Sequence, residues 1–341
     1  MKAVVYRRAQ GLIAEEIPAL HLEDEMLLIR VVNTGFCGSD HSLIESGFLA
    51  DGTILGHEAS GTIAGWGNQV RGFTEGARVI IRPTFCGKCR DCRTGRPYLC
   101  QERRRTIGIG DLPGAFAEYI KVYPQMAIPI PEGVDSRNAA LAETFAAALH
   151  GINTARNEGG SVLVMGGGPI GLAAVRLLKL LGFAPIVLSE PIPGKRDLGK
   201  RFGADHAIDP RSEDLGQKTR EWTHGIGFET ILECSGMAEN VPAAFELISS
   251  GGSLCMISIV FGSITLSQPM LMNFKEFRFT GAYSNTHEEN IRCLTWMAEG
   301  KIDARPLISD LIPLEALPRV YKERINPGRA VKVMLKIGEE F

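Results

Sequence analysis

The sequence lacks a long apolar run, an apolar leader and a large excess of charge of one sign. No stretch reaches the ~18 apolar residues that a membrane-spanning helix requires, and the longest candidate, 170–183, contains Arg176 and Lys179. The N-terminal MKAVVYRRAQ has no apolar core followed by small residues, as a secretory signal would. A formal net charge of only -2 argues against a polyanion-binding surface. We therefore expect a cytoplasmic protein that binds neither membranes nor nucleic acid.

What is present indicates an α/β protein of about two domains, since 341 residues exceed the usual size of one. The first 130 or so residues contain short β-prone runs broken by glycine, which predict a partly open, β-rich barrel. A helix is predicted over 137–155. Beyond residue 161, strands alternate with helices as far as residue 257, which predicts a doubly wound parallel sheet of the Rossmann type. A helix over 288–298 and a strand over 330–336 end the chain.

A glycine-rich run at the first of these strand–helix turns predicts a dinucleotide site. Gly166 permits a tight turn, Gly168 lets the backbone approach a pyrophosphate, and Gly171 allows the helix to pack on the sheet. An acidic residue, Glu190, follows about 20 residues later and would bind ribose hydroxyls and repel a 2′-phosphate, which favours NAD over NADP. The alternative is a glycine turn that binds nothing. The expected nucleotide contacts are Gly166, Gly168, Pro169, Ile170, Gly171, Glu190 and Arg196, of which Arg196, with Lys195, could instead neutralise a phosphate.

Four cysteines spaced C-x2-C-x2-C-x7-C predict a closed zinc site. They are Cys86, Cys89, Cys92 and Cys100. In a reducing compartment such a set is typical of tetrahedral zinc, and because no position stays open this zinc would be structural. Free or disulfide-bonded thiols are one alternative. An iron–sulfur cluster is another, although the proline that ends a ferredoxin run is missing.

A second set of possible ligands combines sulfur, nitrogen and oxygen. Cys37, His57 and Glu143 each have an ordinary explanation alone, as a buried thiol, a hydrogen-bonded histidine and a helical acid. Together they supply the mixture that catalytic zinc sites use while leaving a position open for substrate. The remaining cysteines, Cys234, Cys255 and Cys293, are predicted to be buried apolar residues.

With these residues in hand, the chain resembles the zinc-containing medium-chain alcohol dehydrogenases over nearly its whole length. The pattern Gly56-His57-Glu58-x2-Gly61-x5-Gly67-x2-Val70 fits the zinc signature of that family at every fixed position. The cysteine lobe and the glycine fingerprint follow in the family order. The resemblance implies a GroES-like catalytic domain, 1–150 and 286–341, around an inserted Rossmann domain, 151–285.

The resemblance also implies residue roles. Cys37, His57 and Glu143 look like the ligands of one catalytic zinc, beside the structural one, and Glu58 is similar to a residue that is either a ligand or an adjacent, exchanging one. Ser39 looks like the hydroxyl that takes the alcohol proton. The segment Cys37–Asp40 and the pair Ser189-Glu190 look closest to the butanediol, sorbitol and threonine dehydrogenases, which oxidise secondary alcohols to ketones with NAD.

The chain departs from the family pattern at the relay histidine, which usually falls five residues after the cysteine. Ser42 occupies that position here, and His41 lies one residue earlier. Two other functions stay open: a primary-alcohol or aldehyde oxidoreductase on the same site, and a noncatalytic nucleotide-binding protein. The β-prone segment Glu276–Tyr283 could pair across a two-fold axis, which predicts a homodimer or homotetramer.

Overall fold

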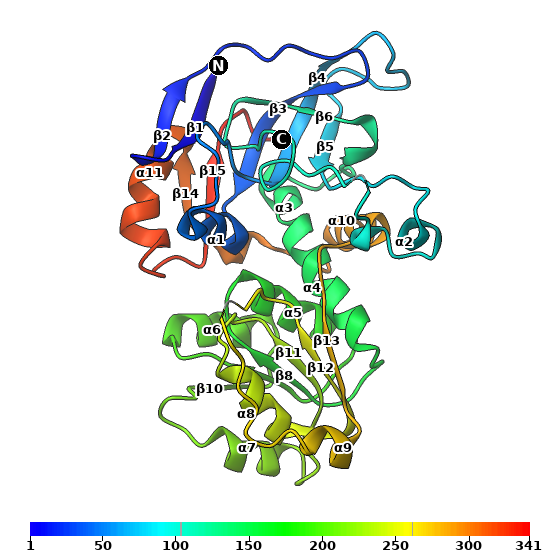
Figure 1. The fold of residues 1–341 in the computed structure, drawn as a ribbon, viewed down its shortest axis with the longest axis vertical. Coiled ribbons are helices and arrows are strands. Elements are labelled where there is room, and N and C mark those ends of the chain that lie inside the picture. Colours follow the sequence, from blue (N-terminus) through cyan, green and yellow to red (C-terminus); the bar gives the residue numbers. More distant parts are fainter. Residues whose placement is uncertain (103, 261) are drawn as a thin grey trace. The chain divides into compact units, whose positions relative to one another are not determined.

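The computed structural model describes residues 1–102, 104–260 and 262–341, which form two compact units. One unit comprises 1–143 and 290–341, and the other comprises 144–289 (Figure 1). These boundaries differ by a few residues from the predicted ones, because they fall inside helices rather than in loops. The helices concerned are α4 (Ala142–Ala155) and α10 (His287–Ala298).

The first unit is built on a seven-stranded, mostly antiparallel sheet. Its strand order is β14-β15-β3-β4-β5-β7, with β6 also paired to β3, and a separate hairpin is formed by β1 and β2. Apolar residues of the strands fill the unit's core. The strands are β1 (Lys2–Arg7), β2 (Gly11–Glu16), β3 (Leu27–Gly35), β4 (Glu58–Trp66), β5 (Arg78–Ile81), β6 (Tyr119–Val122), β7 (Ala127–Pro129), β14 (Ile308–Pro313) and β15 (Lys332–Lys336).

The register of β3 and β4 places Glu58 opposite Gly35 at one end of the sheet. A Cβ atom at Gly35 would collide with the Glu58 carboxylate, so only glycine fits there. On its other side β3 pairs with β15, where Met334 lies opposite Gly35. Two strands distant in sequence therefore bring their residues to the same end of β3, where the site described below lies.

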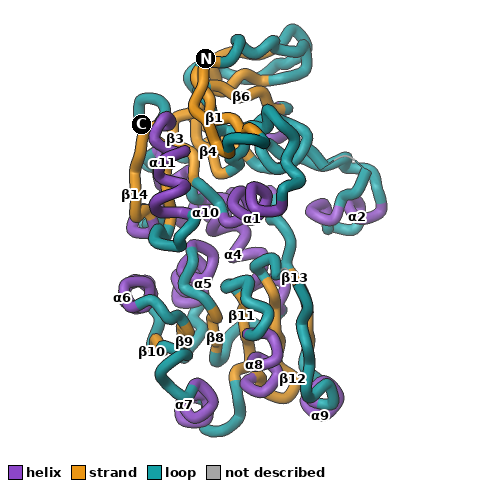
Figure 2. Tube along the Cα trace, turned by 60° about the vertical axis from the view of Figure 1, so that its left-hand side comes forward, coloured by secondary structure: helices purple, strands orange, loops and turns teal. Residues whose placement is uncertain are grey.

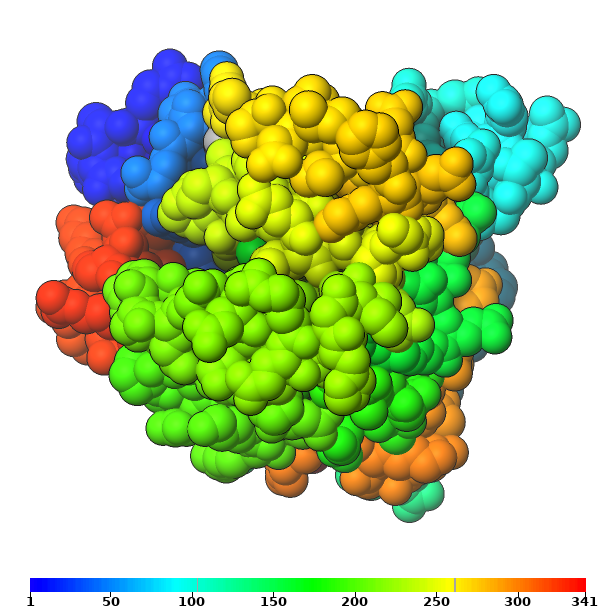
Figure 3. All heavy atoms as spheres, turned by 90° about the horizontal axis from the view of Figure 1, so that it is seen from below, coloured from blue at the N-terminus to red at the C-terminus, as the bar shows by residue number. Residues whose placement is uncertain are grey.

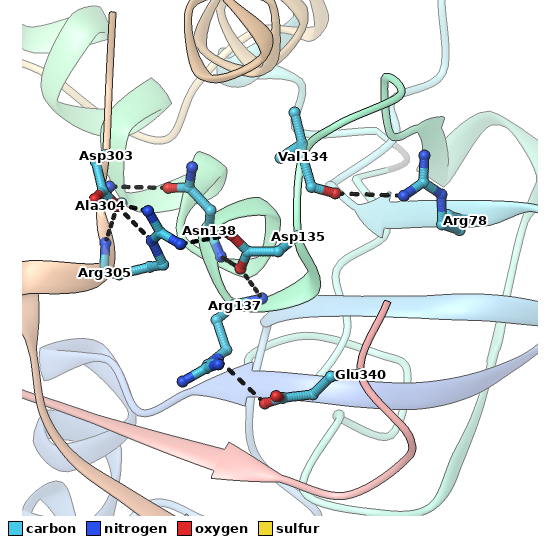
Figure 4. A network of polar contacts seen from close by, with 9 residues as sticks. All are labelled: Arg78, Val134, Asp135, Arg137, Asn138, Asp303, Ala304, Arg305 and Glu340. Carbon is cyan, nitrogen blue, oxygen red and sulfur yellow. Dashed lines mark hydrogen bonds and ion pairs between the residues drawn. The ribbon is translucent and has the colours of Figure 1, made fainter. Parts of the chain in front are cut away.

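The C-terminal segment is tied into the first unit by polar contacts with α3 (Ser136–Ala140) (Figure 4). Asp135 caps α3 through the backbone N–H groups of the next residues and pairs with Arg305 at 3.4 Å. The side-chain oxygen of Asn138 accepts the N–H of Ala304 at 2.8 Å, and Arg137 pairs with Glu340 at 3.2 Å. The helix predicted over 137–155 is two helices, α3 and α4, separated at Leu141.

The second unit is the doubly wound sheet that the sequence predicts. Six parallel strands lie in the order β10-β9-β8-β11-β12-β13, with helices around them (Figure 2). The strands are β8 (Val162–Met165), β9 (Ile186–Ser189), β10 (His206–Ile208), β11 (Phe228–Glu233), β12 (Ile248–Met256) and β13 (Arg278–Gly281). The helices are α5 (Pro169–Leu180), α6 (Pro193–Phe202), α7 (Leu215–Trp222), α8 (Asn240–Leu247) and α9 (Leu271–Lys275).

Among the described residues, no helix is long and apolar enough to span a bilayer.

Candidate functional site: two metal-ligand clusters and a nucleotide turn

The four spaced cysteines converge in a lobe that contains the short helix α2 (Arg90–Arg93). Their four sulfur atoms lie within 4.8 Å of one another. The Sγ atoms of Cys86 and Cys92 are 3.8 Å apart, and those of Cys89 and Cys100 are 3.9 Å apart. A tetrahedron with Zn–S bonds of about 2.3 Å has edges of about 3.8 Å. The sulfur positions therefore fit one zinc ion, and they are too far apart for disulfides.

The chemistry of Cys92 also favours a cation in this lobe. Burial and hydrogen bonds with neighbouring thiols raise the pKa of Cys92 to about 12, so this thiol does not ionise readily without a cation beside it. A divalent cation at the centre of the four thiols would stabilise the thiolates, and its binding would be coupled to the folding of the lobe. A site with four protein ligands would leave no position for substrate, which is typical of a structural zinc.

We expect Cys100→Ser to lower stability with little direct effect on chemistry. Cys100 is the most buried of the four thiols, at 5% exposure, and its loss opens the closed lobe. Tm should fall by about 5 °C or more, since each 1 kcal/mol shifts Tm by roughly 2–4 °C in a domain of this size. Calorimetry with zinc analysis of the same sample checks this. An unchanged Tm with one zinc fewer would contradict a structural role.

The second cluster combines Cys37, His57 and Glu58, whose ligand atoms lie within 4.8 Å of one another. Cys37 is the N-cap of α1 (Gly38–Ser46), His57 precedes β4, and Glu58 is the first residue of that strand. The predicted ligand Glu143 is not a member of this group, but its charge acts on the same neighbour as that of Glu58, as described below. A sulfur, a nitrogen and a carboxylate oxygen converge here, so the donor set fits zinc.

Asp40, which sequence reasoning missed, holds two of these ligands in place. Its carboxylate is fully buried and accepts the N–H of Cys37 at 2.9 Å and that of Gly56 at 3.3 Å. It also lies 3.3 Å from Nδ1 of His57, which leaves Nε2 facing the cluster. Burial lowers the pKa of His57, but the charges of Asp40 and Cys37 raise it above its ordinary value. A carboxylate behind a ligand histidine fixes its tautomer and orientation.

Lys332 of β15 is the second residue that sequence reasoning missed. Its Nζ lies 2.7 Å from each carboxylate oxygen of Glu58, and both side chains are 1% exposed. Burial lowers the pKa of Lys332, but the charges of Glu58, Cys37 and Glu143 raise it above its ordinary value. The ammonium thus balances the carboxylates beside the cluster, including both acids proposed as metal ligands.

Ser39 borders the cluster, and His41 of the same helix belongs to a separate chain of polar contacts. The Ser39 hydroxyl is 3.4 Å from Nε2 of His57. Nδ1 of His41 is 3.1 Å from the Tyr321 hydroxyl, which donates to the exposed Glu45 carboxylate at 2.8 Å. Because the Tyr321 hydroxyl donates its proton to Glu45, it can only accept a hydrogen bond from Nδ1 of His41. Ser42 donates instead to the carbonyl of Gly38, one turn earlier in α1.

The glycine fingerprint has the conformation that a dinucleotide requires. Gly166 adopts φ 103°, and a Cβ there would lie 2.8 Å from the backbone of Ser235. A Cβ at Gly171 would collide with the carbonyl oxygen of Gly166. Gly168 caps α5, and a Cβ atom added there would meet no atom within 4 Å, so that face is open to a pyrophosphate. Pro169 and Ile170 begin the first turn of the helix. The turn and the helix N-terminus fit a dinucleotide.

Glu190 and Arg196 lie next to this turn. The buried Glu190 carboxylate accepts the N–H of Gly167 at 2.7 Å and that of Ile192 at 2.8 Å. It therefore helps to fix the fingerprint turn, and it follows β9, as the acid that binds ribose hydroxyls does in dinucleotide-binding folds. Arg196 donates to the backbone carbonyl of Glu190 at 2.7 Å. The three cysteines predicted to be buried, Cys234, Cys255 and Cys293, are buried.

Comparison with known proteins identifies relatives of both units. The family model of the alcohol dehydrogenase GroES-like domain matches residues 23–132, and that of the zinc-binding dehydrogenases matches 169–299. An L-threonine 3-dehydrogenase of Rhizobium etli is 30% identical over 98% of each chain, and a sorbitol dehydrogenase of Bacillus subtilis is 30% identical over 98% of this chain and 97% of its own. A solved structure from Sinorhizobium meliloti 1021, described as a zinc-binding dehydrogenase bound to NADP, is 30% identical with a TM-score of 0.90, covering 98% of each chain.

Proposed function

The chain belongs to the zinc-containing medium-chain alcohol dehydrogenases, and we propose that it oxidises a secondary alcohol or vicinal diol to the ketone, reversibly, with NAD. The observation that carries the proposal is the convergence of Cys37, His57 and Glu58 beside the Ser39 hydroxyl. Zinc held there supplies a Lewis acid for the substrate oxygen, and the nucleotide accepts the hydride. The names of both curated relatives point to polyol or hydroxy amino acid substrates, and the 3-hydroxyl of L-threonine is a secondary alcohol.

We assign each residue of the site a part in this reaction. Asp40 orients His57, and Lys332 balances the carboxylate charge beside it. Ser39 accepts the hydroxyl proton of the alcohol, and His41 passes it on toward solvent, a role supported by its hydrogen bond with Tyr321, which donates to Glu45. We propose Cys37 and His57 as constant ligands, with Glu58 and Glu143 as the alternative carboxylate ligands.

A matched substrate panel tests this proposal against a primary-alcohol oxidoreductase. We expect kcat/KM, followed by NADH absorbance, to be at least tenfold higher for 2-butanol, 2,3-butanediol, sorbitol or L-threonine than for 1-butanol and ethanol. A preference for the primary alcohols would support the alternative function. Absence of turnover with any alcohol, in protein that binds nucleotide, would support a noncatalytic role.

The preference for NAD over NADP is proposed on the position of Glu190. We expect Glu190→Ala to narrow the ratio of kcat/KM values for NAD and NADP by roughly tenfold, the effect of about 1.4 kcal/mol. The reason is that the carboxylate places a negative charge where a 2′-phosphate would bind. Steady-state kinetics with both nucleotides checks this. Equal kcat/KM values of the wild type for NAD and NADP would contradict the proposed preference. The structure of the Sinorhizobium relative contains NADP.

Ser39→Ala should lower kcat by about 100-fold, the usual scale for losing a proton-transfer group. Its hydroxyl borders the cluster, and a methyl group cannot carry a proton. Ser42→Ala is the matched control, because that hydroxyl is bonded to the Gly38 carbonyl, and we expect a change within about twofold. Stopped-flow measurement of the first turnover separates the chemical step from product release. A wild-type rate for Ser39→Ala would contradict the assignment.

We propose a cytoplasmic protein that forms a homodimer or homotetramer, and the edge of the second unit's sheet supports the oligomer. In the described part of the chain β13 is an edge strand paired with β12, and large apolar side chains are exposed around it. The segment that carries α9 and β13 lies at the surface, coloured yellow to orange in Figure 3. The exposed side chains are Met270, Met272, Phe274, Phe279 and Tyr283.

Phe274→Glu should raise the monomer fraction that light scattering measures.

A further inference from the structure

Two arginines lie against the residues that follow β9, next to the proposed ribose position. Arg196 of α6 donates to the carbonyl of Glu190 at 2.7 Å, and Arg211 donates to the carbonyl of Pro191 at 2.7 Å. Each guanidinium uses only part of its five-donor fork in these bonds. Paired guanidinium groups are the arrangement that proteins use to bind a phosphate dianion.

The carboxylate of Asp209 lies between these two arginines. Asp209 follows β10, whose last residue, Ile208, accepts the N–H of Glu190 at 3.0 Å. One carboxylate oxygen is 3.4 Å from Nη1 of Arg196, and the other is 3.3 Å from Nε of Arg211. The hydrogen bonds of Arg211 and the charge of Arg196 hold the pKa of Asp209 below its ordinary value, so it is charged at neutral pH.

We propose that Arg196 and Arg211 form a latent 2′-phosphate site, and that Asp209 masks it and is thereby a second specificity-determining residue beside Glu190. The inference rests on the proposed use of NAD. A 2′-phosphate would have to displace Asp209 from both guanidinium groups and would face its negative charge. Glu190 acts differently, because its carboxylate accepts backbone N–H groups of the fingerprint turn. Removing Glu190 alone therefore leaves both arginines engaged by Asp209.

The test is nucleotide binding by Asp209→Asn, measured as the Kd of NADPH and NADH by nucleotide fluorescence without alcohol. We expect the Kd of NADPH to fall about tenfold and that of NADH to change less than about twofold. Asparagine keeps the shape of the side chain, and Asp209→Ser should give the same direction if Asp209→Asn folds poorly. Asp197→Asn is the matched control, since it removes an exposed carboxylate from the same helix as Arg196. An equal gain of NADPH affinity in Asp197→Asn would mean that the effect arises from net charge alone, and it would overturn the inference.

The arginines are tested in the Asp209→Asn background. Arg196→Gln and Arg211→Gln should each remove most of the gained NADPH affinity and leave NADH binding nearly unchanged. A gain that survives loss of both guanidinium groups would overturn the inference, as would an unchanged NADPH affinity in Asp209→Asn. A wild type that binds NADH, with no gain in Asp209→Asn, rejects this inference alone. A wild type that binds neither nucleotide rejects the proposed function.

Discussion

His57→Ala should abolish turnover and remove one zinc ion per chain while the fold and the other zinc remain. The substitution deletes the only nitrogen donor of the cluster and leaves Cys37 and Glu58, too few ligands for a catalytic site. Because Lewis-acid stabilisation is worth several kcal/mol and each 1.36 kcal/mol is tenfold in rate, kcat should fall by roughly three orders of magnitude or more. Metal analysis and NADH formation on one preparation measure both effects.

The exposed His21 provides the matched control for this prediction. His21→Ala removes an imidazole from the same unit, and we expect both zinc content and turnover to stay at the wild-type level. Nucleotide binding by His57→Ala should also persist, because the fingerprint turn belongs to the other unit. A His57→Ala variant that keeps two zinc ions and half the wild-type rate would contradict the assignment of His57 as a ligand.

Lys332→Met should lower the free energy of unfolding by about 3–5 kcal/mol, the cost of removing one partner from a buried ion pair. Lys332 and Glu58 are each 1% exposed, so the carboxylate would lose its ammonium in a site that water does not reach. Glu58 would then be a stronger metal donor, and the electronic spectrum of a cobalt-substituted protein should change. Chemical denaturation at neutral pH gives the stability change.

A double variant distinguishes this ion pair from simple loss of packing. Lys332→Met with Glu58→Gln removes both charges and should recover at least about half of the lost stability, since the uncompensated carboxylate is gone. Lys121→Met is the matched control: its partner Glu23 is 42% exposed, and such pairs contribute about 0–1 kcal/mol. A loss in Lys332→Met no larger than in Lys121→Met would contradict a stabilising role for the buried pair.

Local patterns predicted the four-cysteine cluster, the meeting of Cys37 with His57, and the second unit's sheet. The predicted ligand Glu143 lies outside the group that Cys37 and His57 form with Glu58. Strand–helix alternation predicted the parallel sheet because one crossover hand dominates such connections. The unit boundary could not be placed from a helix pattern, because α4 runs through it.

Contacts between distant segments could not be predicted in this way. Tyr321 meets His41 across 280 positions. Lys332 meets Glu58 across 274 positions because β15 and β4 both pair with β3. No periodicity in the sequence reports that pairing. A lysine in a terminal apolar strand, however, is a signal for a buried partner, since an isolated buried charge is too costly. Asp40, three residues after Cys37, carried a similar signal as a carboxylate beside a ligand.

The most direct test of the account is to measure zinc content and alcohol oxidation on the same wild-type preparation. We predict two zinc ions per chain and NADH formation from a secondary alcohol. This activity should fall in proportion to the zinc that a chelator removes from the Cys37–His57 cluster, and it should return when zinc is added. Full activity in protein that holds a single zinc, in the four-cysteine lobe, would contradict the account.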